Sequence, residues 1–315
     1  MTRKSLSSLR SAAMSLVGGC LIALAPAQVV ADVPYPEKAV KIIVPMPAGG
    51  SVDAVARMLA AALSTAFGKP FVVENRAGAS GTIGADAVAK SPADGYTLLM
   101  PLDITLTVVP FLYSRLSFDP SKHLRSVVLL ASSPNVLVVS PSLPVNSIGE
   151  LVALAKKQGL HYASGGNGSP GHLAAELFKK QASIGMTHVP YKGLAPAVTA
   201  MLAGDVQVFF ASISGVEPHI KAGKLRPLAV TSAGRDALMP NLPTMRESGF
   251  RDFDVYSWYA LFAPSGTPDS VVNALYEQSA KAFNSASVQE RLLKQGLTPL
   301  TGKPGEVSEL IRRDQ

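Results

Sequence analysis

The sequence IIVPMPAGGS, residues 42–51, is an apolar strand pattern that ends in a glycine-rich turn and leads directly into a helical pattern. The sequence LHYASGGNGSPG, residues 160–171, repeats this order of elements later in the chain. Small residues at each turn leave backbone N–H groups accessible at a helix start, where the helix dipole favours an anion. Two such helix starts facing each other would form a cleft for a small acid.

The first 31 residues have the pattern of a secretory signal peptide. Basic residues precede an apolar run, and the small residues Val29, Val30 and Ala31 form a cleavage site. A membrane span fits less well, because Pro26 interrupts the apolar run. We therefore expect export to the periplasm with cleavage after Ala31. Cys20 leaves a lipid-anchored form as the alternative.

The composition of the whole chain, including the leader, excludes several classes of protein. With 47% hydrophobic and 16% charged residues, the chain can bury a large core and more than one domain. Cys20 is its only cysteine, and the five histidines lack metal-binding spacing, so we predict no disulfide, metal site or cofactor. Loss of the leader's three basic residues lowers the net charge from +7 to +4, which is too little for a nucleic-acid partner.

Strand and helix patterns alternate along the chain, which predicts an α/β fold with parallel sheets. After residue 262 we expect helices at 269–283 and 288–293 but no new sheet. The pattern predicts a signal peptide at residues 1–31, domain I at 32–132 plus 254–315, and domain II at 133–253. The predicted strands are at residues 40–44, 71–74, 96–100, 127–131, 136–139, 160–164, 187–190, 206–211, 225–231 and 255–262.

The second glycine-rich turn partly matches two enzyme motifs. Residues 166–171 fit the dinucleotide pattern G-x-G-x-x-G between a strand and a helix. However, the acidic residue expected about twenty residues later is absent, because residues 187–190 read THVP. A hydrolase elbow G-x-S-x-G around Ser169 would need glycine in place of Asn167. The motifs therefore disfavour an oxidoreductase or a hydrolase.

Several residues near the turns are predicted to support them. We expect Ser169 to cap the helix that follows and Asp53 to satisfy the positive end of the first helix. Arg76 is expected to buttress the turn through Glu74 or Asp53, with pairing to a ligand carboxylate as the alternative. His172 lies in the first turn of the second helix, where it is either a surface cap residue or a ligand contact.

Six stretches occur in order along the chain, at residues 43–57, 73–84, 93–98, 162–172, 188–193 and 202–207. Together they resemble the Bug receptors, the periplasmic solute-binding proteins of tripartite tricarboxylate transporters. The resemblance implies a two-domain Venus flytrap fold, type II-like, with two crossover strands at the hinge. It also implies a small carboxylate held mainly by main-chain groups of two facing turns and by ordered waters. Met46 stands where relatives commonly have an aromatic residue, which puts stacking against the ligand in doubt.

These observations predict a periplasmic receptor, not an enzyme, which captures a small carboxylate for a tripartite transporter. The expected partners are the carboxylate and the membrane permease subunits, and the receptor is expected to be a monomer. An exported solute sensor with a signalling partner would use the same fold and remains an alternative. The residues predicted to bind ligand are Met46, Ala48, Gly49, Gly50, Ser51, Asp53, Gly165, Asn167, Gly168, Ser169, His172, Tyr191 and Asp205.

Overall fold

One ten-stranded sheet carries the fold of this computed structural model, which describes residues 35–113 and 116–315. The predicted signal peptide and its cleavage site lie outside the described residues. The strand order is β2-β1-β3-β9-β4-β7-β5-β6, and β8 and β10 each pair with β4 beside this path. The strands are β1 (Val40–Val44), β2 (Phe71–Asn75), β3 (Thr97–Leu99), β4 (Leu124–Val139), β5 (His161–Ser164), β6 (Thr187–Pro190), β7 (Val208–Ser212), β8 (Arg226–Val230), β9 (Tyr256–Pro264) and β10 (Thr298–Gly302).

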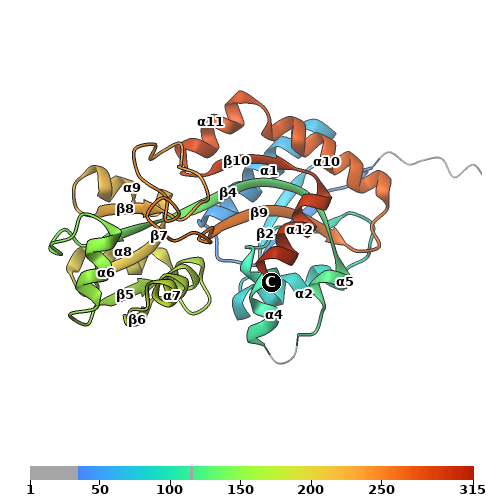
Figure 1. Ribbon diagram of the computed structural model, residues 1–315. Coiled ribbons are helices and arrows are strands. Elements are labelled where there is room, and N and C mark those ends of the chain that lie inside the picture. The colour runs from blue at the N-terminus through green and yellow to red at the C-terminus, as the bar shows by residue number, and fades with distance from the viewer. Residues whose placement is uncertain (1–34, 114–115) are drawn as a thin grey trace, which may run out of the picture. The chain divides into compact units, whose positions relative to one another are not determined.

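Helices pack on both faces of this sheet (Figure 1). They are α1 (Ser51–Phe67), the short 3-10 helix η1 (Ala79–Gly81), α2 (Thr82–Ala89), α3 (Ile104–Thr107), α4 (Val109–Leu112), α5 (Pro120–His123), α6 (Ile148–Ala155), α7 (Pro170–Ala182), α8 (Leu194–Ala203), α9 (Ile213–Lys221), α10 (Asp269–Phe283), α11 (Ala286–Lys294) and α12 (Pro304–Asp314).

The predicted alternation of strands and helices is present as two parallel groups. β1 pairs in parallel with β2 and β3, and β5 pairs in parallel with β6 and β7. In each group the central strand leads through a glycine-rich turn into a helix, from β1 to α1 and from β5 to α7. The two stretches that opened the sequence analysis therefore occupy equivalent positions, at the carboxyl end of a central parallel strand.

Helix α1 follows from its sequence pattern. Val52, Val55, Leu59 and Leu63 recur at helical spacing and are all buried against the sheet. The helix ends at Gly68, whose φ of +65° is a left-handed conformation that favours glycine at this position. Its start is therefore held on the sheet, directly after the turn.

Strand β4 passes through both parts of the sheet. Residues 124–134 pair with β9, and residues 135–139 pair with β7 (Figure 1). The prediction of separate strands at 127–131 and 136–139 was wrong, because Pro134 stays in register opposite Tyr256. The N–H of Asn135, the residue after Pro134, donates to Thr231 Oγ1 at 2.9 Å. This hydrogen bond keeps Asn135 in the strand. A polar, proline-containing segment is thus held extended by its neighbours.

The chain end adds a strand that the sequence did not predict. β10 pairs antiparallel with β4, with Thr298 opposite Ser132 and Pro299 opposite Ala131. β10 joins the existing sheet, so the expectation of helices without a new sheet in this tail is confirmed for the described residues. Proline and glycine give β10 a weak local strand signal, and its pairing with β4 is visible only in three dimensions.

Buried residues form separate clusters on either side of the middle of β4. We call β1, β2, β3, β9, β10 and their helices the first half, and β5 to β8 and their helices the second half. Two hydrophobic clusters pack the first half and two others pack the second half. Contacts nevertheless join Tyr35–Gln315 into one compact unit, so the division into domains at the predicted boundaries stays a prediction.

Candidate ligand-binding site

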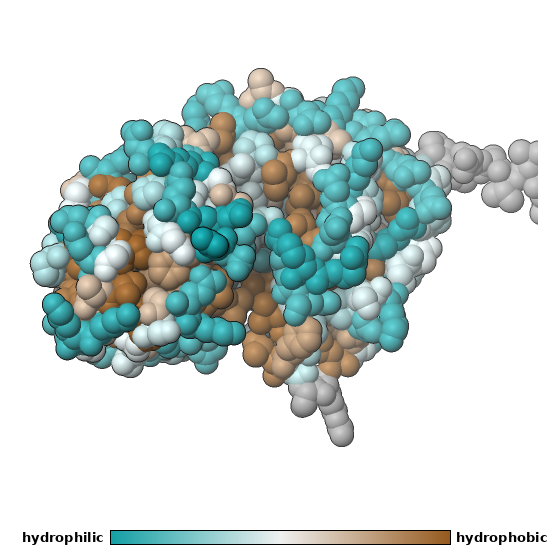
Figure 2. All heavy atoms as spheres, viewed as in Figure 1, coloured by the Kyte–Doolittle hydropathy of each residue, from teal (hydrophilic) through white to brown (hydrophobic). Residues whose placement is uncertain are grey.

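A cavity of about 950 Å³ lies between the two halves. Met46 and Ser51 line it from the first half, and Ser169 and Leu194 line it from the second. Figure 2 shows that the surface is hollowed between the halves and that apolar residues lie beside the hollow. The residues on its wall therefore belong to turns that are far apart in the sequence.

Four helices direct their N-terminal ends at this cavity. First-turn residues of α1, α7, α8 and α9 all belong to its lining. Within the described residues, α1, α8 and α9 have no side-chain cap at these ends, whereas Ser169 caps α7. The first N–H groups of a helix have no intrahelical partner, and the dipole makes this end positive. The cavity is therefore suited to an anion.

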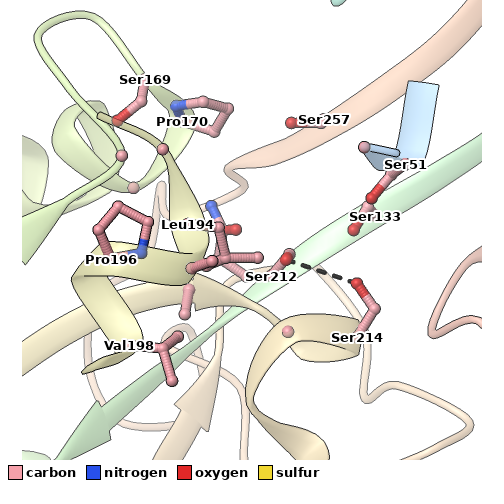
Figure 3. A pocket seen from close by; sticks show the side chains of 18 of the residues that line it. Ser51, Ser133, Ser169, Pro170, Leu194, Pro196, Val198, Ser212, Ser214 and Ser257 are labelled. Carbon is pink, nitrogen blue, oxygen red and sulfur yellow. Dashed lines mark hydrogen bonds between the residues drawn. The ribbon is translucent and has the colours of Figure 1, made fainter. Parts of the chain in front are cut away.

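The side chains of the lining add little charge of their own. Among the residues that the structure describes, the lining contains no aspartate or glutamate, and its basic residues are Lys192 and His219. In Figure 3, Ser51, Ser133 and Ser214 lie across from Pro196 and Val198, whereas Ser169 lies beside Pro170 and Ser212 beside Leu194. A ligand with a negative group and an apolar body would meet no repelling carboxylate here.

The turn after β1 is organised by a buried carboxylate. Gly49 has a φ of +91°, and its N–H donates to Asp53 Oδ2 at 3.0 Å. Asp53 also accepts hydrogen bonds from Arg57 Nε and Asn75 Nδ2, both at 2.9 Å. Burial alone would raise the pKa of Asp53, but the hydrogen bonds from Arg57, Gly49 and Asn75 outweigh it and lower the pKa. Asp53 therefore stays ionised and supports the turn from behind, as the sequence predicted.

The turn after β5 is organised by neutral side chains. Ser164 Oγ accepts from the N–H of Gly166 at 3.1 Å, and His172 Nδ1 accepts from the N–H of Gly168 at 3.1 Å. Ser169 is the N-cap of α7, and its Oγ accepts from the N–H of His172 at 3.4 Å, which confirms the predicted cap. These bonds occupy several N–H groups of the turn, so their partners fix its shape.

Three stacked rings lie beside this second turn. The centroids of His172 and His188 are 4.2 Å apart, and those of Tyr162 and His188 are 4.8 Å apart. Ser164 Oγ lies 2.6 Å from His188 Nε2. Burial lowers the pKa of both histidines, so they are neutral near pH 7. A neutral His172 can accept the hydrogen bond from the turn, as it does here.

The structure brings part of the predicted set together at the cavity. The predicted residues that line it are Met46, Ala48, Gly49, Gly50, Ser51, Gly165 and Ser169.

The other predicted residues are not part of the lining. Asp53, Gly168 and His172 lie behind the turns, with the hydrogen bonds described above. Asn167 is exposed at the tip of the second turn. Tyr191 packs against a hydrophobic cluster of the second half.

Two further residues make local contacts. Asp205 follows the end of α8, and its N–H donates to the carbonyl of Ala200 at 3.1 Å. Arg76 Nε donates to Glu74 Oε1 at 2.6 Å, which is one of the two buttressing contacts that the sequence predicted. Neither residue belongs to the cavity lining.

Sequence reasoning missed most of the remaining wall. The N-terminal ends of α8 and α9 follow Gly193 and Ser212, where a glycine and a serine before helical patterns were the only signals. Ser133, Asn135, Ser257 and Tyr259 reach the cavity from β4 and β9. They lie in extended segments without a recognisable motif, so no local signal marks them.

Within residues 35–113 and 116–315, no group of histidine, cysteine, aspartate or glutamate side chains could hold a metal ion. The helices of that same part of the chain include none with the length and apolarity that a membrane crossing requires.

Known proteins resemble the chain along most of its length. Residues 55–315 match the family described as tripartite tricarboxylate transporter family receptor. Protein BugT of Bordetella pertussis is 38% identical over 284 residues, covering 88% of this chain and 86% of BugT. A solved R. palustris protein with adipate is 36% identical, with a TM-score of 0.81 and coverage of 89% of this chain and 94% of that one. MatC from Rhodopseudomonas palustris with bound malate is 29% identical, with a TM-score of 0.77 and coverage of 89% and 97%.

The fold is that of the periplasmic binding proteins, as predicted. The chain belongs to the receptor family of the tripartite tricarboxylate transporters, which confirms the resemblance to the Bug receptors. This family consists of periplasmic binding receptors and not of enzymes.

Proposed function

We propose that this protein captures a small carboxylate between its two halves. The observation that carries the proposal is the convergence of four helix N-termini on one cavity, whose lining has no acidic side chain within residues 35–113 and 116–315. The solved relatives with adipate and with malate support a carboxylate as the ligand class. The glycine-rich turns after β1 and β5 are the proposed contacts for the carboxylate, with Gly49, Gly50 and Ser51 on one side and Gly165 and Ser169 on the other.

The free energy that such a site offers is sufficient for a transport receptor. A micromolar dissociation constant corresponds to about 8 kcal/mol. A helix end contributes roughly 0.3–1 kcal/mol, and a hydrogen bond to a charged group roughly 1.5–3 kcal/mol. Several N–H donors from both halves therefore reach this affinity without an arginine clamp. Because both halves contribute, the ligand favours an arrangement in which they lie close together.

We further propose that the chain is exported through residues 1–31 and delivers its ligand to membrane permease subunits. Membership in the receptor family of tripartite transporters supports this partnership. The basic and apolar pattern of the leader supports the export.

A melting-temperature screen against a panel of organic acids tests the proposed site. We expect at least one acid to raise the Tm of the parent protein, because a ligand at 100 times its dissociation constant adds about 2.7 kcal/mol. Gly49→Val should abolish this rise, since valine opposes a φ of +91° and covers the N–H groups of the turn.

The matched control is Gly68→Val. Gly68 also has a positive φ, +65°, and open space around it, but it ends α1 away from the cavity. This variant should have a lower Tm than the parent and keep the ligand-induced rise. A preserved rise in Gly49→Val, or no rise with any acid in the parent, would contradict the proposal.

A further inference from the structure

A second cavity, of about 270 Å³, adjoins the cavity of about 950 Å³ between the halves, which we call the ligand cavity. Leu102 and Ser257 line the ligand cavity, whereas their chain neighbours Asp103 and Tyr256 line the second one. Pro170, the first residue of α7, lines both. Asp103 therefore lies in the wall that separates the two cavities.

The carboxyl group of Asp103 is buried without a cation of its own. Asp103 is 7% exposed, and its Oδ1 has no hydrogen-bond partner among the described residues. Within residues 35–113 and 116–315, the only basic residue that lines the second cavity is Arg313, which pairs with Asp314 at 2.8 Å. A buried carboxylate without a cation is costly, so such a group tends to hold a proton instead.

The environment of Asp103 favours this neutral form at pH 7. Burial raises the pKa of Asp103 to about 8, and the negative charge of Asp314 adds to the rise. Hydrogen bonds from the N–H of Ile104 and the hydroxyl of Ser257 oppose the rise but do not cancel it. At pH 7 the carboxyl of Asp103 is therefore mostly protonated.

The charged neighbours of Asp103 are paired with one another. Asp314 accepts hydrogen bonds from Arg313 Nε and Trp258 Nε1, both at 2.8 Å. The residues of α7 that line the second cavity are apolar. The titratable or charged residues that face Asp103 are Asp254, Tyr256, Tyr259, Arg313 and Asp314.

Ser257 connects Asp103 to the ligand cavity. It lines that cavity, it is 6% exposed, and its side chain hydrogen-bonds the carboxyl of Asp103. In the view of Figure 3, Ser257 lies between Pro170 of α7 and Ser51 of α1, at the helix starts that follow the two glycine-rich turns. A change in the hydrogen bonding of Ser257 is therefore felt where the ligand carboxylate is proposed to bind.

The protonation state of Asp103 decides what the Ser257 hydroxyl can offer. A serine hydroxyl has a single proton and donates it to one partner at a time. Protonated Asp103 can donate its O–H to Ser257 Oγ, which leaves the serine proton free for an anion in the ligand cavity. Ionised Asp103 accepts only, so it competes with the anion for the serine proton and also repels the anion through the wall.

We propose that protonated Asp103 is a positioning residue that makes Ser257 a hydrogen-bond donor to the ligand, so that anion capture is linked to a proton held on Asp103. This inference rests on the proposed function, in which the ligand is an anion between the two glycine-rich turns. Linkage is reciprocal, so a bound anion strengthens the hold of Asp103 on its proton.

Calorimetric titration between pH 7 and pH 9.5 tests this linkage. The probes are adipate, malate and the acid that stabilises the parent most in the organic-acid panel, all fully ionised in this range. Burial keeps His172 and His188 neutral throughout the range by lowering the pKa of each, and Tyr259, with a pKa of about 12, stays neutral as well. For the best-bound probe, the Kd of the parent should rise about five- to tenfold from pH 7 to pH 9.5.

Three variants assign the effect to Asp103 and Ser257. Asp103→Asn carries a neutral amide that can donate to Ser257 at every pH, so its Kd should stay within about twofold over the range. Ser257→Ala should weaken binding about tenfold at pH 7 and show a smaller pH dependence than the parent. Asp252→Asn, at an exposed position outside both cavities, is the matched control and should keep the full pH dependence of the parent.

Urea unfolding of the parent and of Asp103→Asn tests the titration without a ligand. The pKa of Asp103 is about 8 in the folded chain and about 3.9 in an unfolded one, so between these values only the folded chain holds the proton. The ratio of the unfolding constants, parent over variant, should rise about tenfold per pH unit up to about pH 8 and level off above it. A ratio that is constant from pH 6.5 to pH 9.5 would overturn the proposal.

The outcomes separate this linkage from the receptor function. A parent Kd that does not change between pH 7 and pH 9.5, or an equal pH dependence in Asp103→Asn, would overturn the linkage and leave the carboxylate receptor intact. The full pH dependence in Ser257→Ala would overturn the assigned part of Ser257. Failure of every acid to bind the parent at pH 7 would overturn the receptor function and this inference with it.

Discussion

The turn after β1 and the turn after β5 present similar helix starts to one cavity, but their supports differ in electrical character. An ionised carboxylate, Asp53, holds the first turn through Gly49, Arg57 and Asn75. The neutral ring of His172 helps to hold the second, through Gly168. Similar backbone geometry is thus supported by a charged side chain at the first turn and by a neutral, titratable side chain at the second turn.

This difference has a consequence for a receptor that binds anions. A fixed negative charge behind the first turn is offset by Arg57 at 2.9 Å, so its repulsion of a ligand is reduced. The second turn carries no such charge, and its shape depends on the protonation state of His172 instead. The first turn should therefore be insensitive to pH above the acid range, whereas the second should respond as the pH falls below 6.5, because burial lowers the pKa of His172 from that value.

The largest expected difference between the two turns comes from Gly171→Ala in α7. A Cβ at this position would lie 2.2 Å from the carbonyl oxygen of Phe210, so α7 must shift away from β7. We expect a loss of about 3 kcal/mol in the free energy of unfolding, typical of severe overpacking, together with loss of ligand binding. Urea unfolding and titration with the best-bound acid measure the two effects.

The corresponding helix-start substitution in the first turn is Gly50→Ala. Its Cβ would meet no atom within 4 Å, and φ is −82°, so stability should change by no more than about 0.5 kcal/mol. Similar losses in both variants would show that close backbone packing does not distinguish the two turns.

A second, smaller effect is expected from removing the charged anchor. Asp53→Ala leaves the N–H of Gly49 without its side-chain acceptor and leaves Asn75 Nδ2 with the carbonyl of Met46 alone, in a site that is 4% exposed. We expect a loss of about 2–3 kcal/mol in urea unfolding. Ser169→Ala, which removes the N-cap of α7, should cost about 1 kcal/mol. The comparison between the turns would be wrong if the serine variant lost more stability than the aspartate variant.

The smallest effect is a pH dependence confined to the second turn. Burial holds the pKa of His172 below its usual 6.5, so the unfolded chain binds this proton more readily than the folded one. The stability that neutral His172 contributes is present above pH 6.5 and is lost as the pH falls through its folded pKa. Protonation of His172 also removes the acceptor for the N–H of Gly168. Loss of this hydrogen bond lowers the free energy of unfolding by about 1 kcal/mol.

Melting curves between pH 7.5 and pH 5 for the parent and for His172→Asn check this sign. The parent should lose more stability on acidification than the variant does. His188 remains in both proteins, but its pKa is lowered by burial and also by His172, so the substitution weakens the acid response of both rings. A steeper acid loss in the variant would contradict the assignment.

The sequence predicted the regular parts of this fold because their signals are local. Helices α1 and α10 and strands β1 and β6 follow from periodicity within a few residues. The middle of β4 could not be predicted, since Ser132, Ser133 and Pro134 read as a break. Their extended conformation comes from pairing with β9, more than a hundred residues away.

The same reasoning explains which part of the site could be foreseen. Glycine-rich turns before helices are sequence motifs, so Gly49, Gly50 and Ser169 were predicted and line the cavity. Ser133 and Ser257 carry no motif, and only the register between β4 and β9 brings them together. Asp53 was predicted to support the start of the first helix. His172 was predicted as a surface cap residue or a ligand contact, and its hydrogen bond from Gly168 required the folded geometry.

Because β4 is one continuous strand, it links the strand register of the first half to that of the second half. Leu129 and Leu130 point into opposite clusters of the first half, and Leu137 and Val138 point into opposite clusters of the second. Sliding this strand by a single residue would move each of these side chains from one buried cluster to the opposite one, in both halves at once. Whichever half organises first during folding therefore dictates the alignment of the other, and neither can adopt a shifted pairing alone.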